Sequence, residues 1–243
     1  MKILLFITLF LISTTACNYS QSSVFDHSKF DELLKANVHE NGMVNYSAFK
    51  NNKNFDDYIK SIAEAEVSNL SKEDKLAFYL NAYNATVIKN VLDHSPITSP
   101  MDVDGFFKKI PHKIAGNEIT LDKLEFDYAM KIEPVLVHFG LVCAAQSCPK
   151  LLRKAYDGKT VFQQLEENGK NFLNDPSKNR LDKENKILYL SEIFKWFKNY
   201  FEERYGSLQK AAHHFMNESD KKFLKENKVE VKFNKYNWQL NSQ

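Results

Sequence analysis

Apolar residues recur at helical spacing over most of the chain, and a few shorter segments have the pattern of strands. The longest helix is predicted from about Lys72 to Leu92, after a capping pattern that starts at Ser71. Further helices are predicted over residues 26–36, 47–65 and 121–131, after Thr160 and after Ser191. Strands are predicted in hairpins at residues 113–121 and around 183–185, in the apolar segment 135–143, and at residues 229–233. This pattern predicts an α+β fold, a single mainly helical domain with a small, mostly antiparallel sheet.

The N-terminal segment, from Met1 to Ala16, has the layout of a secretory signal peptide. Lys2 provides a positive start, the run from Ile3 to Ile12 is apolar apart from Thr8, and small residues follow as far as Ala16. The apolar run is too short to cross a bilayer, which needs roughly 20 apolar residues. The sequence therefore predicts an exported protein whose signal peptide spans residues 1–16.

Cys17 follows the small residues directly, as the lipid-bearing cysteine does in bacterial lipoproteins. Thr14 departs from that pattern, which usually has an aliphatic residue at this position. An ordinary secreted protein, with Cys17 near the cleavage site, is the alternative. The preferred prediction is a lipidated Cys17, a polar tether to residue 25 and one globular domain over residues 26–243. The N-terminal lipid would then anchor the protein to a membrane of the bacterial cell envelope.

The charge balance of the mature chain argues against binding to nucleic acid. Loss of the predicted signal peptide removes one of the 33 basic side chains and leaves 31 acidic ones, for a net charge of +1. A chain so close to neutrality lacks the positive field that would attract nucleic acids or anionic lipid surfaces. The 19 phenylalanines and 11 tyrosines, with only seven glycines, are typical of a packed globular core.

Two asparagines share one face of the predicted helix in the segment AFYLNAYNATVI. Asn81 and Asn84 are three positions apart, and their neighbours at helical spacing are apolar. An amide on an apolar face is costly to bury unless it is hydrogen-bonded. In the structural interpretation, these amides hold a nearby loop in place. In the functional interpretation, one of them orients a catalytic base or stabilises an oxyanion.

The helix predicted after Ser191 carries a row of aromatic side chains that could form a platform for a ligand. Such a row is far more often part of a core, and that is the interpretation we prefer. The row consists of Phe194, Trp196, Phe197, Tyr200, Phe201 and Tyr205.

Two cysteines lie five positions apart in the segment HFGLVCAAQSCP, which begins at His138. If residues 135–143 form a strand, Cys143 ends it. Pro149 favours the start of a helix directly after Cys148. A thiolate at a helix N-terminus is stabilised by the helix dipole and by free backbone N–H groups, which lowers the pKa of the thiol. This pattern makes Cys148 the candidate nucleophile and His138 the nearest candidate base.

Two other interpretations of this segment remain open. Exported proteins meet oxidising conditions, in which paired thiols tend to form disulfides. A Cys143–Cys148 disulfide would close a short loop and stabilise the fold by about 2 kcal/mol. A zinc site would combine His138 with both cysteines, but their spacing lacks the short Cys-x2-Cys hook of structural zinc sites. Neither a metal nor a cofactor is therefore expected.

Four segments carry a resemblance to a known family: GMVNYSAF (42–49), AFYLNAYNATVI (77–88), VHFGLVCAAQSCPKL (137–151) and LSEIFKWFKNYF (190–201). Together they resemble the domain-of-unknown-function family 547, whose bacterial members are often exported. The resemblance covers roughly residues 30–205 and implies no established activity. Two positions depart from the family pattern. Phe126 follows Glu125 where a histidine is usual, and Leu136-Val137 precedes His138 where an arginine is usual.

Two functions from different classes fit these observations. The first is a cysteine-dependent hydrolase or acyltransferase of the cell envelope, with Cys148 as nucleophile and His138 as base, and with Asn81 or Asn84 as the orienting or oxyanion amide. The second is a non-catalytic, lipid-anchored binding or scaffold module, in which a Cys143–Cys148 disulfide is structural. The partner in either case is an unidentified peptide, polymer or protein.

Overall fold

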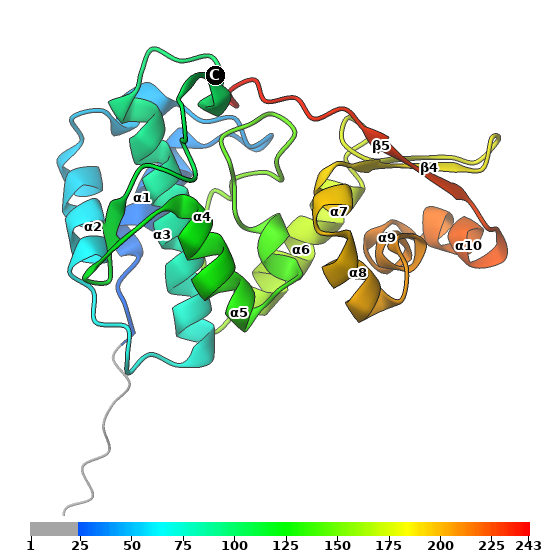
Figure 1. Ribbon diagram of the computed structural model, residues 1–243, viewed down its shortest axis with the longest axis horizontal. Coiled ribbons are helices and arrows are strands. Elements are labelled where there is room, and N and C mark those ends of the chain that lie inside the picture. The colour runs from blue at the N-terminus through cyan, green and yellow to red at the C-terminus, as the bar shows by residue number, and fades with distance from the viewer. Residues whose placement is uncertain (1–23) are drawn as a thin grey trace, which may run out of the picture.

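The helix α3 (Lys72–Asp93) is the centre of the first of two groups of elements in the computed structural model, which describes residues 24–243. Most of its side chains between Leu76 and Val91 are buried, because other elements pack around it (Figure 1). The rest of this first group consists of α1 (Ser28–Asn37), η1 (Tyr46–Phe49), α2 (Lys53–Ala63), η2 (Pro100–Asp102), β1 (His112–Ile114), β2 (Asn117–Ile119), α4 (Leu121–Lys123), η3 (Leu124–Ala129), α5 (Met130–Ile132) and η4 (Leu136–Phe139).

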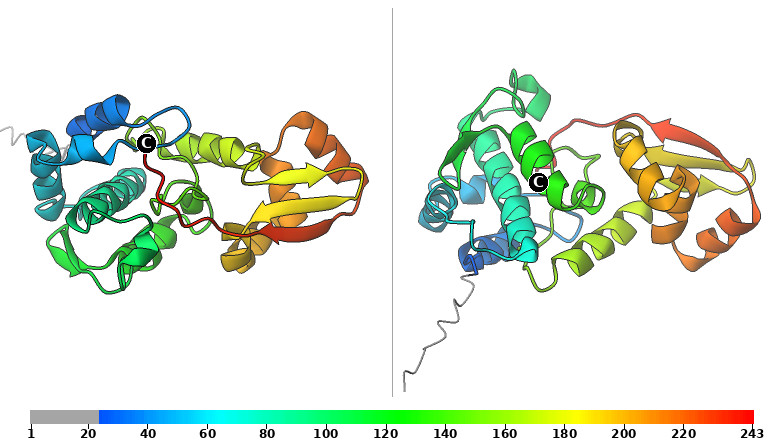
Figure 2. Two further views of the ribbon diagram at one scale, coloured as in Figure 1. Left: turned by 90° about the horizontal axis from the view of Figure 1, so that it is seen from above. Right: turned by 60° about the horizontal axis from the view of Figure 1, so that its bottom comes forward.

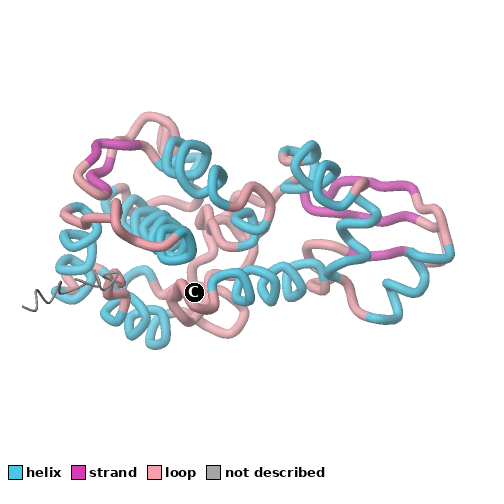
Figure 3. The backbone as a smooth tube through the Cα atoms, turned by 90° about the horizontal axis from the view of Figure 1, so that it is seen from below, coloured by secondary structure: helices cyan, strands magenta, loops and turns pink. Residues whose placement is uncertain are grey.

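The second group combines a sheet with four short helices, and α6 (Val161–Leu173) connects it to the first group (Figure 2). It consists of β3 (Arg180–Asp182), β4 (Ile187–Ser191), α7 (Ile193–Trp196), α8 (Lys198–Tyr205), α9 (Leu208–Phe215), α10 (Glu218–Glu226) and β5 (Glu230–Asn234). Much of the chain that lies between the two groups is loop (Figure 3).

The sheets are small, as the sequence predicts. Strands β1 and β2 form an antiparallel hairpin, and β3 pairs antiparallel with β4. Strand β5 pairs parallel with β4, because the helices α7 to α10 carry the chain back to the other end of the sheet before β5 begins. The fold is of the α+β class, with one parallel strand pair beside two antiparallel ones.

The C-terminal segment, residues 235–243, runs from the second group back to the first (Figure 2). Its main chain bonds to the loop between the two cysteines, where Gln146 N–H donates to the carbonyl of Gln239 at 2.8 Å. Further along, Leu240 pairs with Ala145, and Ser242 pairs with Val44. Segments that are far apart in the sequence are thereby brought to one place.

Local sequence signals explain the elements that were predicted correctly. Ser71 caps α3 and accepts a hydrogen bond of 3.0 Å from the backbone N–H of Asp74. The hairpin predicted at residues 113–121 is β1–β2, and the one around residues 183–185 is β3–β4. Strand β5 lies where residues 229–233 predict it.

The prediction of a strand over residues 135–143 is wrong, because residues 136–139 form the short 3-10 helix η4. The buried carboxylate of Glu133 accepts hydrogen bonds of 3.0 Å from the backbone N–H groups of Val135 and Leu136, which turns the chain at this point. Arg204 of α8 forms an ion pair with the same carboxylate at 2.6 Å. This tertiary contact outweighs the β-propensity of the segment.

The helix predicted after Pro149 is also absent, since residues 149–156 form neither helix nor strand. Polar side chains of distant elements hold the main chain of this segment in place. Asn81 bonds both backbone groups of Tyr156, Asn168 donates to the carbonyl of Lys150, and Asp31 accepts from Ala155 N–H. The prediction that Cys148 lies at a helix N-terminus is therefore wrong.

The aromatic row of residues 194–205 belongs only in part to the core. Phe194 and Phe201 are fully buried, whereas Trp196 is 46% exposed and Tyr200 is 39% exposed. Among residues 24–243, no helix has the length and apolar character needed to cross a membrane. The predicted signal peptide and the lipidation site at Cys17 lie outside the described residues.

Candidate functional site

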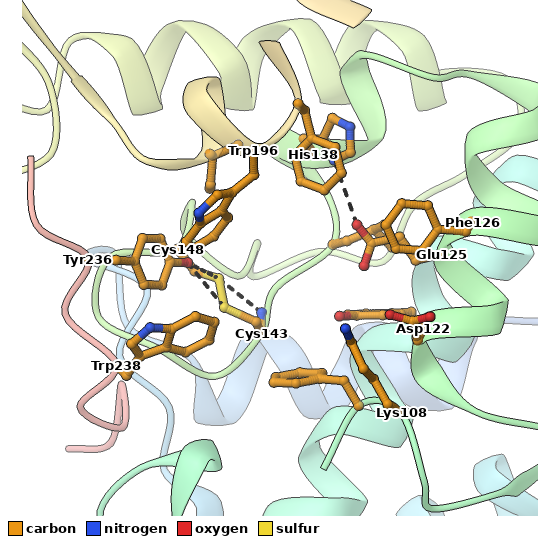
Figure 4. Close-up of a pocket in the computed structure, with 15 residues that line it drawn as sticks. Lys108, Asp122, Glu125, Phe126, His138, Cys143, Cys148, Trp196, Tyr236 and Trp238 are labelled. Carbon is orange, nitrogen blue, oxygen red and sulfur yellow. Dashed lines mark hydrogen bonds and ion pairs between the residues drawn. A yellow bond between two sulfur atoms is a disulfide. The ribbon is translucent and has the colours of Figure 1, made fainter. Parts of the chain in front are cut away.

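A cavity of about 340 Å³ opens between the two groups of elements, and the two cysteines lie in its wall. Its volume falls in the range of pockets that take small organic ligands. Figure 4 shows Trp196, Tyr236 and Trp238 on one side and Lys108, Asp122 and Glu125 on the other. The lining consists of Tyr83, Phe107, Lys108, Asp122, Glu125, Phe126, His138, Leu141, Cys143, Cys148, Ile193, Trp196, Phe197, Tyr236 and Trp238.

Cys143 and Cys148 form a disulfide, with their Cα atoms 6.3 Å apart. The predicted pairing is thus confirmed, although the strand and the helix expected on either side of it are absent. The turn between the two cysteines contains Ala144, which has a positive φ of 62°. The C-terminal segment bonds to this turn through Asn241 N–H, which donates to the carbonyl of Ala144 at 2.9 Å. The loop is therefore fixed at both its ends and its middle.

Two donors contact the sulfur atoms of the disulfide. The backbone N–H of Cys143 donates to Sγ of Cys148 at 3.0 Å. The hydroxyl group of Tyr236 lies 3.2 Å from Sγ of Cys148 and 3.2 Å from Sγ of Cys143. Burial raises the pKa of Tyr236 far above its ordinary value, so the hydroxyl keeps its proton and acts as a donor.

Glu125 and His138 face each other within the cavity wall. The distance between Oε1 of Glu125 and Nδ1 of His138 is 3.8 Å, which is too long for a hydrogen bond. Burial raises the pKa of Glu125 to about 7, with a smaller contribution from the charge of Asp122. Burial also lowers the pKa of His138 to about 3. Between these pH values both groups are neutral, so their contact is not an ion pair.

His138 is buried against the aromatic side chains of the second group. Its ring stacks on Phe197 with 3.6 Å between the ring centroids, and the residue is only 3% exposed. Its Nε2 atom is buried without a hydrogen-bond partner. A buried polar atom of this kind needs an explanation, because such atoms are normally paired. His138 shares the cavity with both cysteines, as the sequence predicts.

Asn81 and Asn84 lie outside the lining of the cavity. Asn81 accepts from the N–H of Tyr156 and donates to its carbonyl, both at 2.9 Å. Asn84 donates to the carbonyl of Gly140 and accepts from the N–H of Val142, also at 2.9 Å. Both amides are buried, and each is hydrogen-bonded through its oxygen and its nitrogen, as the structural interpretation predicts. Asn84 thereby fixes the segment that leads from His138 to Cys143.

Several residues of the cavity were not predicted as site residues. The sequence marks Glu125 and Phe126 only by a departure from the family pattern, although the π-helical turn η3 directs both of them into the cavity. Tyr236 and Trp238 have no local signal, because the C-terminal segment brings them there over a long sequence distance. Within residues 24–243, no group of three or more His, Cys, Asp or Glu side chains is arranged to hold a metal ion.

Residues 67–173 match the family whose model is described as "Protein of unknown function, DUF547". This match confirms the family resemblance for that part of the chain. The matched residues contain two of the four quoted segments, 77–88 and 137–151, and with them His138, Cys143 and Cys148. Glu125 also lies within the match. No curated protein and no solved structure matches the chain. Trp196, Tyr236 and Trp238 complete the cavity from outside the matched residues.

Proposed function

We propose that the protein binds a small organic molecule in this cavity, and that the Cys143–Cys148 disulfide keeps one wall of the cavity in place. The observation that carries the proposal is the lining itself. Both tryptophans of the chain, two tyrosines and three phenylalanines surround a space large enough for a ring-sized ligand. Trp196 and Trp238 remain partly exposed, although burial in a core would be the default for such large apolar side chains.

The polar groups of the cavity define the chemistry of the ligand. Flat aromatic side chains favour a ligand with a flat apolar face. Asp122 and Lys108, on the opposite side, would bond to hydroxyl, amino or carboxyl groups at its other edge. Glu125, with its pKa near 7, both donates and accepts hydrogen bonds around neutral pH. A sugar ring or a short peptide has this combination of an apolar face and a polar edge.

Tryptophan fluorescence tests this proposal directly, since both tryptophans line the cavity. The titration would use a panel of monosaccharides, disaccharides and short peptides at up to millimolar concentration. A saturable change is expected with at least one member, and Phe107→Ala should weaken that binding about tenfold, which corresponds to about 1.4 kcal/mol. Tyr200→Ala, an exposed aromatic residue outside the cavity, is the matched control and should bind normally. A flat response to the whole panel would contradict the proposal.

A second candidate is the cysteine-dependent hydrolase or acyltransferase, favoured by the presence of His138 and both cysteines in one cavity. It requires reduction of the disulfide, after which Cys148 would be the nucleophile and His138 the base. The reduced protein would then hydrolyse an activated ester such as p-nitrophenyl acetate. Activity would be lost in Cys148→Ser, slowed in His138→Ala and kept in Cys143→Ser. Equal rates for the reduced protein and its Cys148→Ser variant would exclude this candidate.

We further propose that Cys17 carries a lipid that anchors the protein to a membrane of the cell envelope. The support is the apolar run of residues 3–12 and the small residues that precede Cys17. One acyl chain binds a membrane only marginally, so stable anchoring requires more than one. The wild-type chain should sediment with membranes, and Cys17→Ser should either release it or leave it unprocessed. Wholly soluble wild-type protein with an unmodified mature N-terminus would contradict this proposal.

A further inference from the structure

The two sulfur atoms of the disulfide have different surroundings. Cys143 is partly exposed, whereas Cys148 is only 3% exposed, although both residues line the cavity. A reagent that enters the cavity therefore finds Cys143 as the more accessible sulfur. In a disulfide, attack on one sulfur releases the other as a thiolate, so this asymmetry makes Cys148 the leaving group.

The surroundings of Cys148 favour a thiolate at this sulfur. Its Sγ atom accepts from the N–H of Cys143 at 3.0 Å and from the hydroxyl of Tyr236 at 3.2 Å. The hydroxyl lies equally close to Sγ of Cys143, so the backbone N–H is the donor that distinguishes Cys148. Hydrogen bonds to the charged form lower the pKa of an acid, and a thiol of lower pKa leaves faster in exchange. Both donors are already in place before the sulfur acquires charge.

A positive charge also lies against the main chain of Cys148. The ammonium group of Lys178 donates to the carbonyl of Cys148 at 2.5 Å, and its side chain is only 12% exposed. Asp175 is 3.9 Å away and offsets part of this charge. A cation near a cysteine favours the thiolate over the thiol.

We propose that the cavity is a site of thiol–disulfide exchange, in which a low-molecular-weight thiol attacks Sγ of Cys143 and Cys148 leaves as a thiolate held by Cys143 N–H and Tyr236 O–H. The volume of about 340 Å³ limits the substrate to a small thiol, and the aromatic walls favour one with an apolar part. This activity goes beyond the proposed ligand binding and does not depend on it.

The exchange balances without any further oxidant. The first thiol enters as a thiolate after losing its proton to solvent, forms a sulfur–sulfur bond to Cys143, and breaks the bond between Cys143 and Cys148. A second thiolate then attacks the substrate sulfur of this mixed disulfide and releases Cys143, so that two thiols become one disulfide. The protein gains the two electrons and two protons as a pair of thiols. A second small disulfide, reacting by the reverse steps, restores the Cys143–Cys148 bond.

The site of attack can be determined on the wild-type sulfur pair. Full-length protein carrying Cys17→Ser has Cys143 and Cys148 as its only cysteines. It would be exposed briefly to reduced glutathione, quenched with an alkylating reagent, and mapped by peptide mass spectrometry. Glutathione is expected on Cys143 and the alkyl group on Cys148. Glutathione on Cys148, or an even distribution over both cysteines, would overturn the proposal. It would also be overturned if the Cys143–Cys148 disulfide stayed intact in the presence of a reductant strong enough to reduce oxidised glutathione.

The role of Tyr236 can be separated from its contribution to stability. Tyr236→Phe should slow reduction of the disulfide by dithiothreitol about tenfold, because the leaving thiolate loses one donor. Tyr46→Phe is the matched control. Tyr46 is also buried and also bonds to the C-terminal segment, through Asn241, but it does not contact either sulfur. Equal rates of reduction in Tyr236→Phe and Tyr46→Phe would overturn the assigned role.

The size of the substrate can be tested with a reduced, unfolded protein in place of glutathione. Its cysteines should exchange with the disulfide at least tenfold more slowly per thiol than glutathione does, because a folded cavity of this volume admits only small molecules. A faster reaction with the unfolded protein would overturn the assignment of a low-molecular-weight thiol. Failure of the ligand titration described above would leave all three of these results unaffected, so the two proposals can fail separately.

Discussion

Two amides of α3 and two titratable groups in the wall of the cavity are buried in opposite ways. On α3, Asn81 and Asn84 are paired at both the oxygen and the nitrogen of their amides, each time with main-chain groups. In the cavity, Glu125 and His138 approach to 3.8 Å without a hydrogen bond, and Nε2 of His138 has no partner. Paired amides specify a fold, whereas unpaired titratable groups are the ones left available for binding or chemistry.

The pKa values express the same difference. Burial moves the pKa of Glu125 upwards and that of His138 downwards, and the backbone of Pro134 opposes only a small part of the shift at His138. The fold thus tolerates two neutral titratable groups where it could hold apolar ones. Substitutions of Asn81 and Asn84 should therefore act mainly on stability, and those of Glu125 and His138 mainly on function.

Among substitutions of polar side chains, the largest effect is expected from the amides of α3. Asn81→Ala and Asn84→Ala should each lower the free energy of unfolding by about 3 kcal/mol, since each leaves one buried N–H and one buried carbonyl unpaired. Denaturant unfolding with a tryptophan signal measures this change. Asn54→Ala, at an exposed position of α2, is the control and should stay within about 0.5 kcal/mol. Losses at both α3 sites as small as that of the control would show that their hydrogen bonds do not stabilise the fold.

Glu125→Gln should reveal a pH-dependent difference in stability of about 2 kcal/mol, since one unit of pKa shift corresponds to about 1.4 kcal/mol. The folded state raises the pKa of Glu125 from 4.5 to about 7, so the native protein holds a proton that the unfolded chain has released. Stability from this group is complete below pH 4.5 and is lost as the pH rises through 7. The stability of wild type relative to the variant should therefore fall over this interval. The side chain of Glu125 is 17% exposed, which keeps the effect below the full value implied by the pKa shift.

Unfolding curves measured at several pH values across this interval test the prediction. Glu184→Gln removes one carboxylate at an exposed position and controls for the change in net charge. A difference between wild type and Glu125→Gln that is constant with pH, or that grows in favour of wild type as the pH rises, would mean that Glu125 is not held neutral in the fold.

The disulfide is expected to have an effect of similar or smaller size. It closes a loop between residues five positions apart, for which the chain-entropy model gives about 2 kcal/mol. Cys148→Ser should therefore lower the free energy of unfolding by at most this amount under non-reducing conditions. Under reducing conditions, wild type and variant should unfold alike. A variant as stable as the oxidised wild type would show that the hydrogen bonds of the C-terminal segment alone hold the loop.

Local signals in the sequence were sufficient for the regular elements and for the cysteine pair. Ser71 and the apolar periodicity after it predict α3, and the four residues between Cys143 and Cys148 are enough for a turn that brings the two sulfur atoms together. The segments 135–143 and 149–156 could not be predicted, because their conformation depends on distant residues. Arg204 pairs with Glu133 beside the first segment, and Asn81 and Asn168 bond to the main chain of the second. The same holds for the cavity.

The cavity depends on the C-terminal segment, whose position no local pattern indicates. Tyr236 reaches the sulfur of Cys148 across 88 positions of sequence, and Trp238 packs beside it with 4.6 Å between the ring centroids. The sequence does place His138 and the cysteines together, since they are neighbours along the chain. It does not supply the aromatic wall or the approach of Glu125, so it predicts the chemistry of the sulfur pair better than the binding site around it.

The smallest effect on stability is expected at the exposed edge of the cavity. Phe126 is 43% exposed and its ring lies 6.1 Å from that of Phe197, so Phe126→Ala should change the free energy of unfolding by no more than about 0.5 kcal/mol. Phe201→Ala, the same substitution at a fully buried position, should cost about 3–5 kcal/mol and is the contrast.

Phe126→Ala should nevertheless weaken binding of any ligand found in the fluorescence titration, because the ring forms part of the lining. Both tryptophans are retained, so one titration measures the binding of variant and wild type alike. Unchanged affinity, together with a loss of stability that approaches the loss in Phe201→Ala, would place Phe126 with the core rather than with the site. That result would remove the distinction between the two regions at this position.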